Sequence, residues 1–179
     1  MGYNSCMEIL TDYVLFDLET TGLYPETDEV IEIAALRVAG GEVVSEFSTL
    51  VDPGIHIPYV ASRVNGITDD MVKGAPPMDR VLREFVDFVG DSVLMGHNIV
   101  RFDMRFIQKD ACKYLGCKIG NELADTLMIA RSLLPELPSR SLASLAQHYN
   151  VSYAGAHRAL ADCYINKKVY DCMMRDMRR

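Results

Sequence analysis

The sequence predicts an α/β fold built around a mixed sheet. Three β-rich runs open the chain, and helical patterns with a short strand among them fill the remainder. A Gly-Gly pair at residues 40–41 separates the second run from the third, which is typical of a β-hairpin. We therefore expect antiparallel neighbours on one side of the sheet, and parallel neighbours on the other side, where helices connect the strands.

The residue types explain the three strands predicted near the N-terminus. Valine, isoleucine, leucine and phenylalanine dominate these runs, and such side chains favour strands that are buried on at least one face. Residues 52–67 are interrupted by Gly and Pro, so we expect a loop with one helical turn there. The three strands are expected at residues 10–17, 30–38 and 42–51.

Helical periodicity dominates the chain from residue 68 onwards. The clearest pattern is MDRVLREFVDFVG, whose apolar residues fall on one helical face. SVLMGHN (92–98) is instead predicted to be a short strand that ends in polar residues. The helices are expected at residues 68–73, 78–89, 102–115, 125–134, 141–149 and 157–177.

Length, charge and hydropathy restrict the class of protein. A chain of 179 residues fits one domain with a sizeable core. Its net charge of −7 argues against a protein that holds nucleic acid by bulk electrostatic attraction, but suits an enzyme whose acids bind cations. The sequence contains no apolar run of about 18 residues, its N-terminus MGYNSCMEIL lacks signal-peptide features, and its five cysteines are an odd number. We expect reduced thiols, a cytoplasmic location and no membrane partner.

Two acids follow the apolar start of VLFDLETTGL, residues 14–23. Asp17 and Glu19 are two residues apart, so on a strand their side chains point to the same side. Two like charges repel each other there unless a cation lies between them, and carboxylate oxygens suit Mg²⁺ or Mn²⁺. Gly22 then permits a tight turn. The alternative is a solvent-facing acid pair, which the apolar run before Asp17 makes less attractive.

Two further segments carry polar residues that suit such a site. GHNIVRFDMRFI (96–107) begins where a predicted strand ends and contains Asp103, which is equally well explained as a helix-start acid. HRALADCY (157–164) places His157 at a predicted helix start and Asp162 five residues later. The alternative for His157 is a capping or surface residue.

Together, these segments supply four acids and one base. Four carboxylates can hold two divalent ions, which stabilise the attacking and leaving oxygens of a phosphoryl displacement. A histidine can accept the proton of the attacking water. We therefore expect a metal-dependent phosphodiesterase site with two Mg²⁺ or Mn²⁺ ions and the catalytic residues Asp17, Glu19, Asp103, His157 and Asp162.

Three segments, FDLETTGL, HNIVRFD and HRALADC, resemble the exonuclease motifs of the DEDDh family, which includes proofreading exonucleases of bacterial DNA polymerase III, such as its epsilon subunit, and several RNases. NGITDDMVKGAP (65–76) and ADTLMIAR (124–131) are similar to connecting segments of the proofreading members. The resemblance covers about residues 12–171 and implies one exonuclease domain over 1–179. It implies an RNase H-like fold, with a mixed five-stranded sheet flanked by helices, and 3′→5′ release of nucleoside 5′-monophosphates.

The resemblance also implies which acids bind the metal ions directly. Asp17, Glu19 and Asp162 would bind the ions directly, and Asp103 would act mainly through water on the second ion. Asp125 would not bind the ions itself but would lie next to these ligands and help to hold them in place. The base would be His157, as expected from the residues alone.

For the substrate, the resemblance implies contacts around the terminal nucleotide. Thr20 and Thr21 would offer backbone and hydroxyl groups, Leu23 would wedge against the base, and Asn98 would orient the site near the scissile phosphate. Many members read HGI where this chain has Asn65-Gly66-Ile67, so a substrate contact is doubtful there. The residues expected to contact the substrate are Thr20, Thr21, Gly22, Leu23, Asn98 and Phe102.

Several alternatives remain open at this stage. The connecting segments favour DNA 3′ ends over RNA, but an exoribonuclease remains an alternative because no short motif reveals contacts to the 2′-OH. A non-catalytic module that binds a polymerase is a second alternative, and a DNA polymerase is an expected partner in either case. The chain ends at RDMRR soon after its last predicted helix, without a polymerase-binding tail like that of the epsilon subunit. We therefore expect a stand-alone nuclease or an excised domain.

Overall fold

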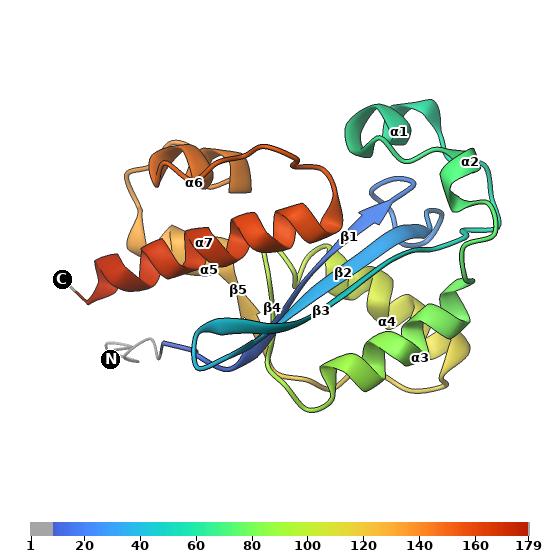
Figure 1. Cartoon of the computed structure of the whole chain (residues 1–179), viewed down its shortest axis with the longest axis horizontal. Coiled ribbons are helices and arrows are strands. Elements are labelled where there is room, and N and C mark those ends of the chain that lie inside the picture. The colour runs from blue at the N-terminus through green and yellow to red at the C-terminus, as the bar shows by residue number, and fades with distance from the viewer. Residues whose placement is uncertain (1–8, 179) are drawn as a thin grey trace.

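A five-stranded sheet with the order β3-β2-β1-β4-β5 forms the centre of the protein (Figure 1). The computed structural model describes residues 9–178. β1, β2 and β3 pair antiparallel, whereas β4 pairs parallel with both β1 and β5. The predicted mixed sheet is therefore confirmed. The strands are β1 (Tyr13–Thr20), β2 (Val30–Ala39), β3 (Glu42–Leu50), β4 (Leu94–Gly96) and β5 (Leu123–Asp125).

Helices cover both faces of this sheet. Residues 52–67, expected to be a loop with one helical turn, hold α1, because the helix breakers fall at Pro58 and Gly66 and leave seven residues between them. The other expected helices are present, with boundaries that differ by a few residues. The helices are α1 (Tyr59–Asn65), α2 (Asp69–Val72), α3 (Met78–Val89), α4 (Asp103–Tyr114), α5 (Thr126–Leu133), α6 (Leu142–His148) and α7 (Ala159–Met177).

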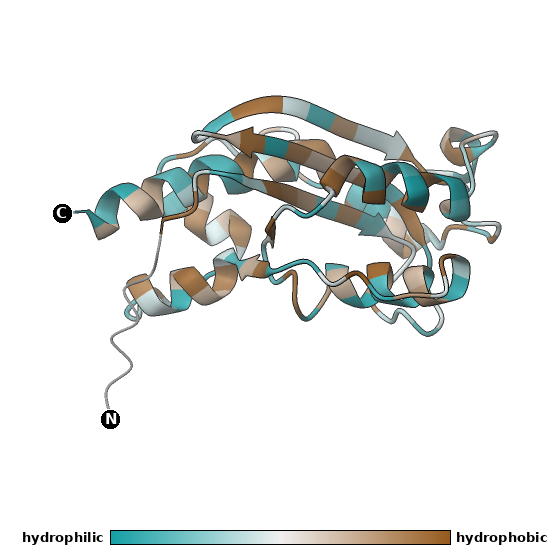
Figure 2. Ribbon diagram, turned by 90° about the horizontal axis from the view of Figure 1, so that it is seen from below, coloured by the Kyte–Doolittle hydropathy of each residue, from teal (hydrophilic) through white to brown (hydrophobic). Residues whose placement is uncertain are grey.

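The side chains of β1 alternate between two hydrophobic layers. Val14 and Phe16 pack in the layer that contains α3 and α4, whereas Tyr13 and Leu15 pack in the layer that contains α7. Figure 2 shows many hydrophobic residues along the strands, and both hydrophobic and hydrophilic residues along the helices, as expected for helices that bury one face. The odd-numbered residues of β1 therefore face α7. Since β1 continues to Thr20, this direction also holds for the acids in its second half.

The pairing of β4 with β1 ends at Leu15–Met95, so β1 extends beyond its parallel neighbour. β4 is only three residues long and ends at Gly96. A Cβ atom at this glycine would lie 3.0 Å from the Phe16 carbonyl oxygen and from Ile99, so the close approach of the two backbones leaves no room for a side chain. The second half of β1 thus borders a gap in the sheet, which other groups can enter.

The sequence predicted neither a membrane span nor a signal peptide. No helix within residues 9–178 is long and apolar enough to cross a bilayer. The segment MGYNSCME, where the sequence indicates no signal peptide, lies outside the described residues. Cys112, Cys117, Cys163 and Cys172 are free thiols.

Asp110 of α4 is a buried acid that is not among the four predicted from the sequence, and its replacement gives a first prediction. Its side chain is fully buried, neither carboxylate oxygen accepts a hydrogen bond from described residues, and Lys109 Nζ approaches only to 3.5 Å. Lys109 instead bonds to Glu29 at 2.8 Å. Burial raises the pKa of Asp110 above its usual value. The protonated form therefore stabilises the fold at acid pH, and this contribution is lost as the pH rises through the folded pKa.

We expect Asp110→Asn to raise the melting temperature by about 2–4 °C at pH 8, the effect of roughly 1 kcal/mol in a domain of this size, and by less at pH 5. Scanning calorimetry at the two pH values measures the difference. Asp87→Asn, an exposed acid on α3, is the matched control and should change little. A decrease for Asp110→Asn at both pH values would contradict the interpretation.

Candidate functional site

Three acids meet where the start of α7 lies beside the second half of β1 (Figure 1). Asp17 and Glu19 are half-buried on β1, and Asp162 is buried in the first turn of α7. One carboxylate oxygen from each lies within 4.8 Å of the others. The strand predicted at residues 10–17 is longer than expected, because its pairing with β2 continues to Thr20. Both acids are therefore fixed by the sheet and point toward α7.

Asp103 reaches this site through the gap beyond β4. It is the first residue of α4 and is 2% exposed. Its carboxylate accepts a hydrogen bond from the backbone N–H of Leu18, which lies between the two acids of β1. Asp103 is not a member of the close three-acid group, but its charge acts on Asp17. All four acids predicted from the sequence are thus brought together.

Burial raises the pKa values of all four acids, and neighbouring acids add to this effect. Burial, followed by the charges of Asp103 and Asp162, holds the pKa of Asp17 well above its usual value. Burial is also the main cause that raises the pKa of Glu19 to about 7 and that of Asp103 to about 7. Burial raises the pKa of Asp162 as well. Negative charge at this site is therefore costly without a cation.

These carboxylates fit a hard divalent cation. Oxygen ligands from several carboxylates are the set that Mg²⁺ and Mn²⁺ take in proteins. Asp162 Oδ1 is buried and accepts no hydrogen bond from the described residues, so one ligand atom is left for an ion. Asp162 Oδ2, in contrast, accepts the backbone N–H of His157 at 2.9 Å.

His157 lies just before α7 and is exposed at the edge of the site. Its backbone φ is +67°, a left-handed conformation that is uncommon for histidine. The hydrogen bond to Asp162 fixes this backbone, and the imidazole stands edge-on to Tyr153 with ring centres 6.1 Å apart. His157 therefore belongs to the turn that precedes the helix, held next to a predicted metal ligand.

Sequence analysis missed Glu32 as a residue of the site. Glu32 is 3% exposed and lies opposite Glu19 in the pairing of β1 with β2. Its carboxylate accepts hydrogen bonds from Arg158 Nη2 at 2.6 Å, Arg158 Nε at 3.1 Å and the Ala159 N–H at 3.0 Å. These bonds attach the start of α7 to the sheet directly after His157. The available signal was a single acid inside the apolar run VIEIAAL.

Asn65 is a second residue whose role the sequence did not reveal. It ends α1 and is buried, and its Oδ1 accepts the Ile67 N–H at 3.0 Å. Its side chain also forms a hydrogen bond with Glu19, which lowers the pKa of that acid against the effect of burial. Asn65 thus positions Glu19, which is a role distinct from the doubtful substrate contact.

The end of β1 and the loop that follows it carry four of the predicted substrate residues. Thr20 donates its hydroxyl to the Gly22 carbonyl, and Thr21 donates to Asp28 at 3.4 Å, so both buried hydroxyls hold the loop itself. A Cβ atom at Gly22 would lie 2.4 Å from the Asp28 carboxylate, so a larger residue there would displace the Asp28 side chain, which accepts the Tyr24 N–H at 2.8 Å. Leu23 is 69% exposed at the tip of this loop.

The remaining predicted residues lie beside Asp103. Asn98 is half-buried and has a φ of +62°, and its N–H donates to Asp125 Oδ1 at 3.0 Å. Asp125 also accepts the Leu127 N–H at the start of α5, which ties the ends of β4 and β5 together. Phe102 is half-buried and packs on Phe106. Asp125 thus supports the backbone at Asn98 rather than contacting the three-acid group.

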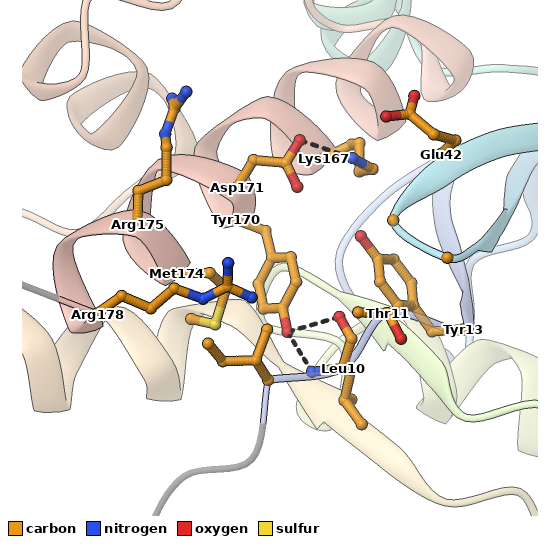
Figure 3. Close-up of a pocket in the computed structure, with 13 residues that line it drawn as sticks. Leu10, Thr11, Tyr13, Glu42, Lys167, Tyr170, Asp171, Met174, Arg175 and Arg178 are labelled. Atoms are coloured by element: carbon orange, nitrogen blue, oxygen red, sulfur yellow. Dashed lines mark hydrogen bonds and ion pairs between the residues drawn. The ribbon is translucent and has the colours of Figure 1, made fainter.

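A separate cavity of about 390 Å³ lies at the opposite end of β1 (Figure 3). Tyr13 and Tyr170 line it, the Tyr170 hydroxyl bonds to Leu10, and the Lys167–Asp171 ion pair closes one side. Six residues of extended strand, about 20 Å, separate Tyr13 from Glu19. This cavity therefore contributes nothing to the acidic site.

Comparison with known proteins adds to this geometry. Residues 14–170 match the protein family described as "Exonuclease". The DNA polymerase III subunit epsilon of Aquifex aeolicus is 41% identical over 158 residues, which cover 88% of this chain and 78% of that protein. The DNA polymerase III PolC-type of Clostridium perfringens is 40% identical over 93% of this chain, which spans only 11% of that much longer protein.

Solved structures show the same architecture. Exonuclease X, in complex with 5′ overhanging duplex DNA, has a TM-score of 0.73 and 27% identity, with 91% of each chain covered. Exonuclease I of E. coli, in complex with a dA16 oligonucleotide, has a TM-score of 0.78 over 91% of this chain and 43% of its own length. At 21% identity, the second likeness concerns the fold alone.

Proposed function

Because the chain belongs to the exonuclease family, we propose that it releases nucleoside 5′-monophosphates from the 3′ ends of DNA with the help of divalent metal ions. The observation that carries this proposal is the meeting of Asp17, Glu19 and Asp162 within 4.8 Å, with Asp103 beside them. Four carboxylates, two of them buried and two half-buried, cost free energy in one place unless cations neutralise them. Their arrangement is therefore best explained by metal binding.

The acids would hold two Mg²⁺ or Mn²⁺ ions, with Asp17, Glu19 and Asp162 as direct ligands and Asp103 acting mainly through water. When bound, two such ions stabilise the charge on the attacking and leaving oxygens of the phosphodiester. Side chains of the protein would carry out the proton transfer. His157 would accept the proton of the attacking water, and the Glu32–Arg158 ion pair would keep the turn that carries it in place.

Four groups would position the terminal nucleotide. Leu23, exposed at its loop tip, would pack against the base, and Phe102 would support it from α4. The hydroxyls of Thr20 and Thr21 are bonded internally and the Thr21 N–H donates to the Glu29 carbonyl at 2.9 Å, so these residues would hold the loop that presents Leu23 to the nucleotide. Asn98 would face the scissile phosphate. These contacts fix the reacting bond next to the acids, which is the main task of a phosphoryl-transfer site.

We propose DNA as the physiological substrate and a DNA polymerase as the partner. The support comes from relatives, since those named above are parts of DNA polymerase III and exonuclease X is seen with DNA. A digest of 5′-labelled single-stranded DNA and RNA of equal length, with Mg²⁺, Mn²⁺ or EDTA, tests the function. We expect a ladder from the 3′ end with DNA, slower cleavage of RNA and none in EDTA. Binding of DNA without cleavage under all conditions would contradict the proposal.

Thermal stability should reveal the metal site independently of activity. The folded pKa values of Glu19 and Asp103 lie near 7, above their usual values, so protonation at acid pH stabilises the metal-free fold. This contribution is lost as the pH rises through about 7, and a divalent ion can then replace the protons. We expect MgCl₂ to raise the melting temperature clearly at pH 8 and little at pH 5.5. NaCl of equal ionic strength is the control, and an equal shift with NaCl would contradict specific binding.

A further inference from the structure

A polar cavity of about 470 Å³ adjoins the acidic site on the side of β4 and β5. His97 and Asn98, which follow β4, form one wall, and Arg131 of α5 forms another. Arg140 and Ser141, just before α6, complete it. Asn98 lines this cavity and is also one of the residues predicted to contact the substrate near the acids. None of the functions assigned above uses the remaining walls.

Two guanidinium groups give the cavity its charge. Arg131 is exposed, and its Nη1 lies 3.4 Å from the Met128 sulfur. Arg140 donates from Nε and Nη2 to the Leu134 carbonyl at 3.0 and 2.8 Å, which fixes the plane of its guanidinium. Neither group forms an ion pair with a carboxylate among residues 9–178. In a chain of net charge −7, two such groups on one cavity indicate an anionic ligand.

The imidazole of His97 lies between these groups. Its Nδ1 is 3.1 Å from the Thr126 hydroxyl, and the ring also bonds to the backbone of Arg140. Burial lowers the pKa of His97, the nearby charge of Arg131 lowers it further, and Asp125 acts in the opposite direction. The charge of Arg131 therefore acts on the ring at the cavity wall, although its side chain is exposed to solvent.

The cavity lies at the same edge of the sheet as the acids, where a bound nucleic-acid strand would pass. β1, β4 and β5 are parallel neighbours, and ligands of such sheets bind at the carboxyl ends of the strands. Adjacent strands lie about 4.8 Å apart, so the ends of β4 and β5 are roughly 5 and 10 Å from β1, which carries Asp17 and Glu19. A nucleic-acid strand whose terminal phosphodiester lies at the acids can therefore place its next phosphates over this cavity.

We propose that this cavity binds a phosphate of the substrate strand on the 5′ side of the scissile bond, with Arg131 and Arg140 as its cationic partners. This inference rests on the proposed function. Guanidinium groups bind phosphate through their N–H donors. The Leu134 and Pro135 carbonyls hold Nε and Nη2 of Arg140 in place, which leaves its Nη1 for this contact. Because the contact is the same before and during the reaction, it lowers KM and leaves kcat nearly unchanged.

The first experiment leaves the protein unaltered and changes the substrate. A single uncharged methylphosphonate replaces each phosphodiester in turn along an oligonucleotide of eight thymidines, beginning at the second bond from the 3′ end. We expect one or two positions near the 3′ end at which KM for the first cleavage rises about tenfold, with kcat nearly unchanged. Equal KM values at every position would overturn the proposal.

The second experiment connects that position to the cavity. Arg131→Gln is chosen because the side chain holds no backbone group, so the fold should survive. Arg80→Gln, on α3 and paired only with Glu84, removes the same charge elsewhere. We expect Arg131→Gln to raise KM for the octamer about tenfold and to abolish the methylphosphonate effect, while Arg80→Gln behaves like the parent protein. Retention of the full methylphosphonate effect in Arg131→Gln would overturn the assignment.

Two readouts separate this inference from the proposed function. The 4-nitrophenyl ester of thymidine 5′-monophosphate has no phosphate on the 5′ side, so Arg131→Gln and the parent should hydrolyse it equally. Failure of the parent to hydrolyse either substrate would contradict the nuclease activity alone. Anisotropy of a 5′-labelled octamer in Ca²⁺ then still tests the cavity. Arg131→Gln should bind more weakly and reduce the slope of log K against log salt by about 0.7, and an unchanged slope would overturn the proposal.

Discussion

Replacement of Asp17 by asparagine is expected to lower nucleotide release by roughly 10³-fold and, at the same time, to stabilise the metal-free protein. The loss follows because a ligand of both ions would contribute several kcal/mol to charge stabilisation in the transition state. The gain follows because the charges of Asp103, Asp162, Glu19 and Glu32 all act on the Asp17 carboxylate. Removal of one of several buried like charges relieves their repulsion.

Both effects of Asp17→Asn can be measured on one preparation. Steady-state digestion of labelled DNA in Mg²⁺ gives the rate, and melting at pH 8 in EDTA gives the stability. The melting shift on addition of MgCl₂ should shrink at the same time. Asp87→Asn on α3 is the control for loss of a carboxylate, and should change none of the three. Near-normal turnover by Asp17→Asn, or a lower melting temperature in EDTA, would show that Asp17 is not part of a metal site.

Replacement of His157 by alanine is expected to cost about 10²–10⁴-fold in turnover, the usual contribution of a general base. Metal binding should persist, because His157 reaches Asp162 through its backbone N–H rather than its ring. The shift in melting temperature on addition of MgCl₂ should therefore match that of the parent protein. Imidazole added to the reaction should restore part of the lost rate, which a purely structural residue would not allow.

The left-handed backbone at His157 requires a second variant. Asparagine tolerates this conformation better than alanine, so His157→Asn separates a loss of the base from a disturbed turn. We expect both variants to be equally slow. His148→Ala, an exposed histidine on α6, is the control for loss of an imidazole. Normal turnover by His157→Asn would assign the residue to the geometry of the turn and not to proton transfer.

The sequence was most informative where a local pattern decides the structure. Alternating side chains placed Asp17 and Glu19 on one face of a strand, and Gly40-Gly41 predicted the hairpin, with both glycines at positive φ. The apolar stripe of residues 78–89 likewise predicted a helix with one buried face. In each case the signal lies within a few residues, and tertiary contacts agree with it.

Other features depend on contacts between distant segments. β5 has three residues, too few for a periodic pattern, and exists because β4 provides a parallel partner. Glu32 and Arg158 are far apart in the chain, so their ion pair follows from the docking of α7 and not from either segment alone. Asn65 was assessed only as a possible substrate contact, since its bond to Glu19 requires α1 to lie over the end of β1.

The place of α7 at the end of the domain also determines when the enzyme becomes competent during its synthesis. A nascent chain that has completed the sheet but not this helix contains Asp17, Glu19 and Glu32, and it lacks Asp162, His157 and Arg158. Such a chain has neither the full ligand set nor the base, and Glu32 has no cation to neutralise it. On the proposed function, a nascent chain that lacks α7 therefore cannot release nucleotides from DNA.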